Sequence, residues 1–261
     1  MDHMRKSENV KQQYANSDNL NIRSLIHAKY SVNKQGFRNW LNDQYELWNG
    51  CRILELGCGN GDMWMDKIKQ LGTDSTLILS DFSEGMVEEV RKKYDCYENI
   101  LTQQINIEDI PYEDLSFDIV IANMMLYHVP DLEKALSEVA RVLKPGGKFY
   151  SATYGENGIH NYILITLNTV GMLQEIPNSF TLQNGAQILS EYFNSVIKEE
   201  YMDHLEITDT KDLLDYVYSM ESVIPVKRED RARMFELFEK KKDENGRIII
   251  PKEYGMFISA K

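Results

Sequence analysis

Short apolar runs alternate with amphipathic stretches along the middle of the chain. The apolar runs have the length of buried parallel strands, which are hydrophobic throughout because helices cover both faces of a parallel sheet. They lie at residues 51–56, 76–80, 100–105, 117–122 and 148–153. Apolar residues recur at helical spacing in the intervening segments 63–71, 83–94 and 131–143. Strands and helices that alternate in this way predict a doubly wound α/β fold with a mostly parallel sheet.

Turn and capping residues mark the ends of several of these elements. Asn49-Gly50 interrupts the chain before the first strand, and Lys144-Pro145-Gly146-Gly147 forms a turn before the fifth. Ser83 is placed to cap the helix that follows the second strand, with Glu84 in its first turn. The central part of the chain therefore has locally defined boundaries.

The pattern changes on both sides of this central part. Residues 7–47 are predicted to form helical pieces, with Phe37, Trp40, Leu41 and Trp48 on one helix face. After Tyr154 the pattern predicts the following elements: helices near 162–170, 186–192, 209–220 and 228–242, a strand at 195–201, and a closing hairpin of 247–250 with 254–260. The expected organisation is an N-terminal helical cap (1–48), a core (49–154), and lid insertions with the last strands (155–261).

Composition and charge limit the classes of partner that the chain is expected to bind. The chain of 261 residues has a formal charge of −12, which argues against binding to nucleic acid, whose affinity rests on Lys and Arg. No apolar stretch approaches the roughly 20 residues that cross a bilayer, so no membrane partner is expected. The three cysteines have no disulfide or metal-site spacing, and we expect a cytoplasmic protein with reduced thiols and no metal.

A glycine-rich loop follows the first predicted strand. Gly57, Gly59 and Gly61 allow a tight turn and a close approach of the backbone to a ligand at the carboxyl end of the strand. A dinucleotide fold would need its third glycine at position 62, which is Asp62, an unfavourable neighbour for a pyrophosphate. Asp81 ends the second predicted strand and lies at the same edge of the sheet.

These residues resemble the first two motifs of class I S-adenosylmethionine (SAM)-dependent methyltransferases. In that family the loop binds SAM, and the acid after the second strand accepts hydrogen bonds from the ribose hydroxyls. The resemblance covers about residues 52–153 and implies a Rossmann-like sheet of seven strands, with the last antiparallel. It implies the following cofactor-binding residues: Glu55, Gly57, Gly59, Gly61, Asp81, Phe82, Met86, Asn106, Ile107 and Asn123.

The N-terminal segment offers further candidates for the cofactor. Many relatives close such a segment over SAM, with a tyrosine or an arginine that reaches its carboxylate. Tyr14, Arg23, His27 and Tyr30 are candidates on this basis. An N-terminal helix that simply packs on the sheet is the alternative.

His128 and Tyr154 are the predicted catalytic residues. His128 follows the fourth strand and could act as a general base, although a packing role is the alternative. Tyr154 and His160, beyond the fifth strand, could line the acceptor pocket or belong to an ordinary lid. Asn123-Met124-Met125-Leu126 is not the Asn-Pro-Pro-Tyr motif of enzymes that methylate nitrogens in DNA and proteins.

The resemblance therefore implies methyl transfer from SAM to oxygen, nitrogen or carbon of a small molecule, with S-adenosylhomocysteine as the product. Two other functions are compatible with the sequence. One is a SAM-binding sensor or partner-binding protein without turnover, and the other is an NAD(P)-dependent oxidoreductase.

Overall fold

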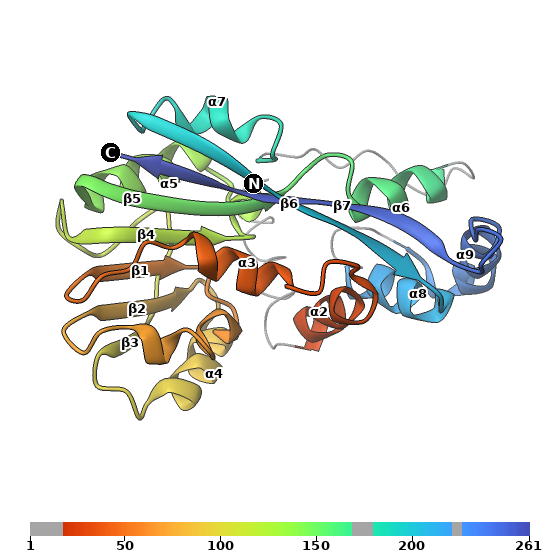
Figure 1. Ribbon diagram of the computed structural model, residues 1–261, viewed down its shortest axis with the longest axis horizontal. Helices are drawn as coiled ribbons and strands as arrows, with labels where there is room; N and C mark the ends of the chain where they lie inside the picture. The colour runs from red at the N-terminus through yellow and green to blue at the C-terminus, as the bar shows by residue number, and fades with distance from the viewer. Residues whose placement is uncertain (1–17, 169–179, 221–225) are drawn as a thin grey trace.

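The computed structural model describes residues 18–168, 180–220 and 226–261 (Figure 1). Three parts of the sequence predictions lie outside the described residues: the helical piece at 7–17 with Tyr14, the end of the predicted 162–170 helix, and the 169–179 part of the lid. Within the described residues, no helix is long and apolar enough to cross a membrane.

One seven-stranded sheet forms the centre of the molecule (Figure 1). Its strands are β1 (Arg52–Leu56), β2 (Thr76–Asp81), β3 (Ile100–Gln104), β4 (Phe117–Asn123), β5 (Leu143–Tyr154), β6 (Ser195–Ile207) and β7 (Ile248–Ala260). The order is β3-β2-β1-β4-β5-β7-β6; strands β1 to β5 pair in parallel, and β7 is antiparallel to both of its neighbours. The predicted Rossmann-like α/β fold is confirmed.

Helices cover both faces of the sheet. They are α2 (Asp18–Tyr30), α3 (Phe37–Gln44), α4 (Glu84–Tyr94), α5 (Leu132–Val142), α6 (Ile159–Asn168), α7 (Gly185–Leu189), α8 (Thr210–Ser219) and α9 (Arg231–Glu239), with short 3₁₀ turns between them. Successive residues of β1 point to opposite faces. Leu54 packs into the core on the side of α5, whereas Ile53 packs into the core on the side of α3.

A second hydrophobic core lies beyond the end of β5. The pairing of β7 with β5 stops at Tyr254, but β6 and β7 continue side by side to Ile207 and Ile248. Helices α2, α6, α8 and α9 gather around this two-stranded extension (Figure 1). Their apolar side chains pack with Leu205 and Ile250 of the extension. A helical lobe is thereby placed next to the carboxyl ends of the parallel strands.

The predicted hairpin at the end of the chain is wrong, because residues 248–260 form the single strand β7. The prediction placed a short loop at 251–253, and that loop begins with a proline, which lacks the N–H that a central strand needs. Pro251 lies in the extension, where β7 pairs with β6 but no longer with β5. One edge of β7 is unpaired there, and proline is tolerated at such an edge.

The predicted helix at 63–71 is replaced by two 3₁₀ turns, Asp62–Trp64 and Ile68–Gln70. Side chains of α3 donate hydrogen bonds to the backbone carbonyls at the start of the 63–71 segment. Arg38 donates to the carbonyl of Asp62 at 3.3 Å, and Asn42 donates to that of Met63 at 3.1 Å. These contacts compete with the hydrogen bonds that an α-helix would form at the same carbonyls.

Other local predictions are confirmed or shortened. Ser83 caps α4 through a hydrogen bond from the amide of Met86, and α5 agrees with the predicted helix within one residue at each end. Helix α3 ends at Gln44, so Trp48 is not on its face and is half exposed.

Candidate functional site

The glycine loop after β1 has the backbone that its sequence predicted. Gly57, Gly59 and Gly61 have φ values of 71°, 56° and 71°, in the left-handed region that favours glycine. A Cβ at Gly57 would lie 2.9 Å from the side chain of Met125. The loop therefore keeps both its turn and its close contact with Met125, in the segment after β4, only with glycine at this position.

Asp81 is held against this loop by backbone amides. Its Oδ2 accepts from the N–H of Gly59 at 2.9 Å, and its Oδ1 accepts from the N–H of Ser83 at 2.8 Å. Burial raises the pKa of Asp81, although both hydrogen bonds act in the opposite direction. The carboxylate is thus fixed in place before any ligand arrives.

Glu55 is the centre of a buried polar network beneath the loop. Its Oε2 accepts from the indole N–H of Trp64 at 2.5 Å, and its Oε1 accepts from the amide of Asn123 at 3.4 Å. The same amide donates to the hydroxyl of Tyr45 at 2.7 Å. Burial raises the pKa of Glu55 to about 7. The contributions of Tyr45 and Trp64 were not predicted, because Tyr45 lies outside any motif and Trp64 was assigned to a helix.

One cavity of about 420 Å³ opens at the carboxyl ends of the parallel strands. Predicted cofactor residues line one end: Glu55, Gly57, Gly59, Asp81, Phe82, Asn106, Ile107 and Asn123. Rings and imidazoles line the other end: His27, Phe37, Tyr127, His128, His160, Tyr216 and Tyr254. Arg23 also lines the cavity, so the structure brings most of the predicted site residues together.

Four predicted residues do not contribute to the cavity lining. The carbonyl of Gly61 accepts from the hydroxyl of Tyr94, and Met86 is fully buried on the inner face of α4. The hydroxyl of Tyr30 donates to Asp212 at 2.6 Å, in the packing between α2 and α8. Tyr154 packs with its ring centroid 4.6 Å from that of Tyr127 and 4.8 Å from that of His160, behind the lining residues.

Two histidines at the ring-lined end are neutral at physiological pH. Burial, followed by the positive charge of Lys252, lowers the pKa of His27 to about 3. Burial, followed by the charge of Arg23, lowers the pKa of His160 to about 4. The hydroxyl of Tyr254 lies 3.0 Å from Nε2 of His27, and the hydroxyl of Tyr216 lies 3.3 Å from Nε2 of His160. These tyrosines come from β7 and α8, and no local signal in the sequence connects them to the site.

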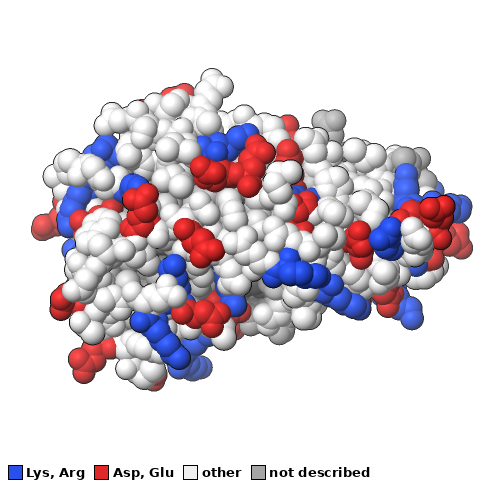
Figure 2. Space-filling model, viewed as in Figure 1, with Lys and Arg blue, Asp and Glu red and all other residues white. Residues whose placement is uncertain are grey.

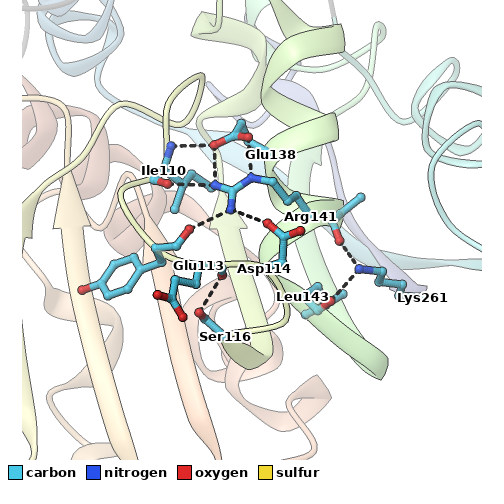
Figure 3. Close-up of polar contacts among 10 residues, drawn as sticks. Ile110, Glu113, Asp114, Ser116, Glu138, Arg141, Leu143 and Lys261 are labelled. Atoms are coloured by element: carbon cyan, nitrogen blue, oxygen red, sulfur yellow. Dashed lines mark hydrogen bonds and ion pairs between the residues drawn. The ribbon is translucent and has the colours of Figure 1, made fainter.

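The segment after β3 is braced by Arg141 of α5 (Figure 3). Its guanidinium donates to the carbonyls of Ile110 and Tyr112, at 2.9 and 2.7 Å, and forms ion pairs with Glu138 and Asp114. Glu138 in turn accepts from the amide of Ile110 at 2.9 Å. This brace fixes the segment that places Asn106 and Ile107 in the cavity.

Replacing Arg141 with methionine should lower the free energy of unfolding by about 1–3 kcal/mol, because several partly buried acceptors lose their donor. Urea unfolding would measure the loss, and faster hydrogen exchange at the amide of Ile110 would locate it. Arg91→Met is the matched control, since its ion pair with Glu88 is exposed and should contribute about 0–1 kcal/mol. Equal losses in the two variants would contradict the bracing role.

Within the described residues, no group of three or more His, Cys, Asp or Glu side chains could hold a metal ion.

Comparisons with known proteins agree with this geometry. The family model described as "Methyltransferase domain" matches residues 47–217. A demethylmenaquinone methyltransferase of Symbiobacterium thermophilum is 38% identical over 103 residues, which cover 38% of this chain and 41% of the relative. The ubiquinone/menaquinone biosynthesis C-methyltransferase UbiE of Rickettsia prowazekii is 40% identical over 103 residues, which cover 37% and 42%. The matches therefore span less than half the length of these relatives.

The fold also has close structural neighbours. The YcgJ protein of Bacillus subtilis superposes with a TM-score of 0.63 at 19% identity, and the match covers 86% of this chain and 97% of that protein. At this identity the likeness concerns the fold alone.

Proposed function

The chain belongs to the class I family of SAM-dependent methyltransferases, and from this premise we propose that it transfers a methyl group from SAM to a small molecule. Its cofactor, SAM, supplies an electrophilic methyl group on a sulfonium and leaves as S-adenosylhomocysteine. The observation that carries the proposal is that one continuous cavity is lined both by the cofactor-type motifs and by a set of rings and imidazoles.

The residues at the motif end fit the chemistry of SAM. In this proposal the Asp81 carboxylate accepts from the ribose hydroxyls, and Phe82 and Ile107 make apolar contacts with the adenine. Glu55 and Asn123 suit an ammonium group, since the Oδ1 of Asn123 is buried without a hydrogen-bond partner among the described residues. The glycine loop lets the backbone approach the amino-acid part of the cofactor.

The chain's own contribution to the reaction is to orient the acceptor and to exclude water. Bringing two reactants together in the correct geometry can lower a barrier by several kcal/mol, up to about 7–11 in ideal cases. The relatives named for demethylmenaquinone and for quinone C-methylation make a quinone-type ring a candidate acceptor. The ring-lined end of the cavity supports a planar acceptor of this general kind.

The charge of the protein supports a small molecule rather than a nucleic acid. Figure 2 shows acidic and basic side chains interspersed over this face of the described residues. With a net charge of −12, the chain repels polyphosphates.

Ligand titration tests this function. SAM and S-adenosylhomocysteine should raise the melting temperature of the purified chain, whereas NADH should not. Incubation with SAM and quinol-type acceptors should then release S-adenosylhomocysteine. Stabilisation by NADH alone would favour the oxidoreductase, and cofactor binding without release from any acceptor tested would favour the sensor.

The affinity for S-adenosylhomocysteine should depend on pH through Glu55. Its pKa of about 7 in the free protein means that the carboxyl is mostly protonated at pH 6, and a proton must be lost before it can bind an ammonium. We expect roughly tenfold weaker binding at pH 6 than at pH 8, measured by calorimetry. Glu55→Gln should remove most of this dependence, and an unchanged pH profile in that variant would contradict the role of Glu55.

The same pKa affects the ligand-free protein. Because the folded-state pKa is above the ordinary value of 4.5, the folded state binds more protons between these two values. The stability of the ligand-free protein should therefore fall as the pH rises from about 4.5 to about 7.

His128 remains the proposed general base, because it lines the cavity beyond β4. Replacing it with alanine should leave the affinity for S-adenosylhomocysteine nearly unchanged and lower turnover by roughly 10²–10⁴-fold. Calorimetry and a turnover assay would measure the two effects. If neither changes, His128 is a packing residue.

A further inference from the structure

We propose that the ring-lined end of the cavity binds a planar aromatic acceptor through an oxygen atom, a phenol or an aryl carboxylate, that accepts a hydrogen bond from His27. This inference rests on the proposed function, because the molecule bound at this end is the methyl acceptor. It names both the chemical class of that acceptor and a residue that binds it.

The shape of this end suits a flat molecule. The ring of His27 has its centroid 5.5 Å from that of Tyr254 and 6.0 Å from that of Tyr216, and Phe37 lies 5.0 Å from Tyr254. His160 continues the wall at 6.4 Å from Tyr216. Aromatic groups attract one another at such separations in edge-to-face or offset geometry, so an aromatic ligand would extend an arrangement that already exists.

The hydrogen bond of Tyr254 determines which nitrogen of His27 carries the proton. The hydroxyl of Tyr254 is buried, and its only hydrogen bond among the described residues is the one to Nε2 of His27, at 3.0 Å. The hydroxyl therefore donates to Nε2, since a buried hydroxyl without an acceptor is costly. The neutral imidazole then carries its hydrogen on Nδ1.

Among the residues that the structure describes, none accepts a hydrogen bond from this Nδ1–H. His27 is half-buried and lines the cavity, and its Nδ1 atom is buried with no hydrogen-bond partner among the described residues. A buried donor left in this state is unfavourable, and a ligand oxygen would satisfy it on binding. The ligand group that fits is an acceptor of hydrogen bonds, and an ammonium does not fit.

The charges around the cavity favour the same type of group. The acidic residues that line it are Glu55, Asp62, Asp81 and Glu108, all from the loops and strand ends of the cofactor end. Arg23 lies one helical turn before His27 on the same face of α2, and its positive charge acts on His160 and Tyr254. The charge of Arg23 therefore stabilises an oxygen with negative charge at the ring-lined end.

Calorimetry with matched probes tests the inference. The full chain, saturated with S-adenosylhomocysteine, is titrated with 4-methylphenol, 4-methylbenzoate and 4-methylbenzylamine, which share one ring and differ in the polar group. At least one oxygen probe should bind roughly tenfold more tightly than the amine. Tighter binding of 4-methylphenol than of 4-methylbenzoate identifies the oxygen as phenolic, and the reverse identifies it as a carboxylate.

Variants of His27 connect that preference to its Nδ1–H. His27→Phe keeps a ring and should lower the affinity for the preferred probe roughly tenfold. His27→Asn places an amide N–H near the position of Nδ1 and should restore part of that affinity. His204→Phe is the control, since His204 lies on β6 outside the cavity lining. All variants should bind S-adenosylhomocysteine as tightly as the wild type.

The outcomes separate the two levels of the proposal. Failure of the wild type to bind S-adenosylhomocysteine overturns the proposed function, and the inference with it. If S-adenosylhomocysteine binds, three results overturn the inference alone. They are that neither oxygen probe binds, that all three probes bind equally, or that His27→Phe binds the preferred probe as tightly as the wild type does.

Discussion

Replacing Lys252 with methionine is expected to lower the free energy of unfolding by about 3–5 kcal/mol. The side chains of Lys252 and Asp203 are 2% and 0% exposed, and they form an ion pair of 3.0 Å between β7 and β6. Without the ammonium, the buried carboxylate would keep only its hydrogen bonds from Ser31, Asn33 and His204. Urea unfolding measures the difference.

The pair also explains why this loss should be large. Burial alone would raise the pKa of Asp203, but the hydrogen bonds from Ser31 and Asn33, together with Lys252, hold that pKa below its ordinary value. The ammonium lies 5.1 and 5.2 Å from the ring centroids of Tyr201 and Tyr254, so its replacement removes cation–π contacts as well.

Two further variants make the prediction specific. The double variant Lys252→Met with Asp203→Asn removes both charges and should recover much of the stability, because the buried charge is no longer left alone. Lys198→Met changes an exposed lysine of β6 that pairs with Glu200, and its effect should be about 0–1 kcal/mol. A Lys252→Met protein as stable as Lys198→Met would show that the buried pair does not stabilise the fold.

Replacing Asp81 with alanine is expected to weaken S-adenosylhomocysteine binding by about 1–3 kcal/mol, or roughly 5- to 150-fold. The carboxylate would lose its hydrogen bonds to the ribose, and the loop would lose the acceptor for the amide of Gly59. Asp81→Asn keeps one oxygen for these contacts and should fall between alanine and the wild type. Calorimetry would give the three affinities.

The control for this series is Asp95→Ala. Asp95 is an exposed acid at the end of α4, and its replacement should leave the affinity unchanged. Urea unfolding of all variants distinguishes a loss of contacts to the ligand from a loosened loop. An Asp81→Ala protein that binds as tightly as the wild type would remove Asp81 from the proposed site.

The meeting of the glycine loop and Asp81 at the cavity could be predicted because both lie at the ends of neighbouring strands. The glycine loop joins one strand to the following turn, and Asp81 ends the neighbouring strand, so a parallel sheet brings them to the same edge. Even there, the sequence did not reveal that Trp64 turns inward to Glu55. That contact depends on α3, whose side chains bind the carbonyls that a helix at 63–71 would have used.

The ring-lined end could not be predicted because it is assembled from distant segments. His27, His160, Tyr216 and Tyr254 come from four elements, and they meet only because β6 and β7 extend beyond β5. No short-range periodicity or motif in the sequence indicates that these four side chains lie together.

The sequence by itself determined the α/β core, the family and the donor of the methyl group, because hydrophobic period, glycine conformation and strand-end acids are local properties. Only the tertiary structure decided that β7 is one strand, that Lys252 and Asp203 neutralise each other inside the protein, and which side chains face the acceptor. These features depend on burial and on contacts between residues as far apart as His27 and Tyr254, and the free energy of such contacts exists only once the chain has folded.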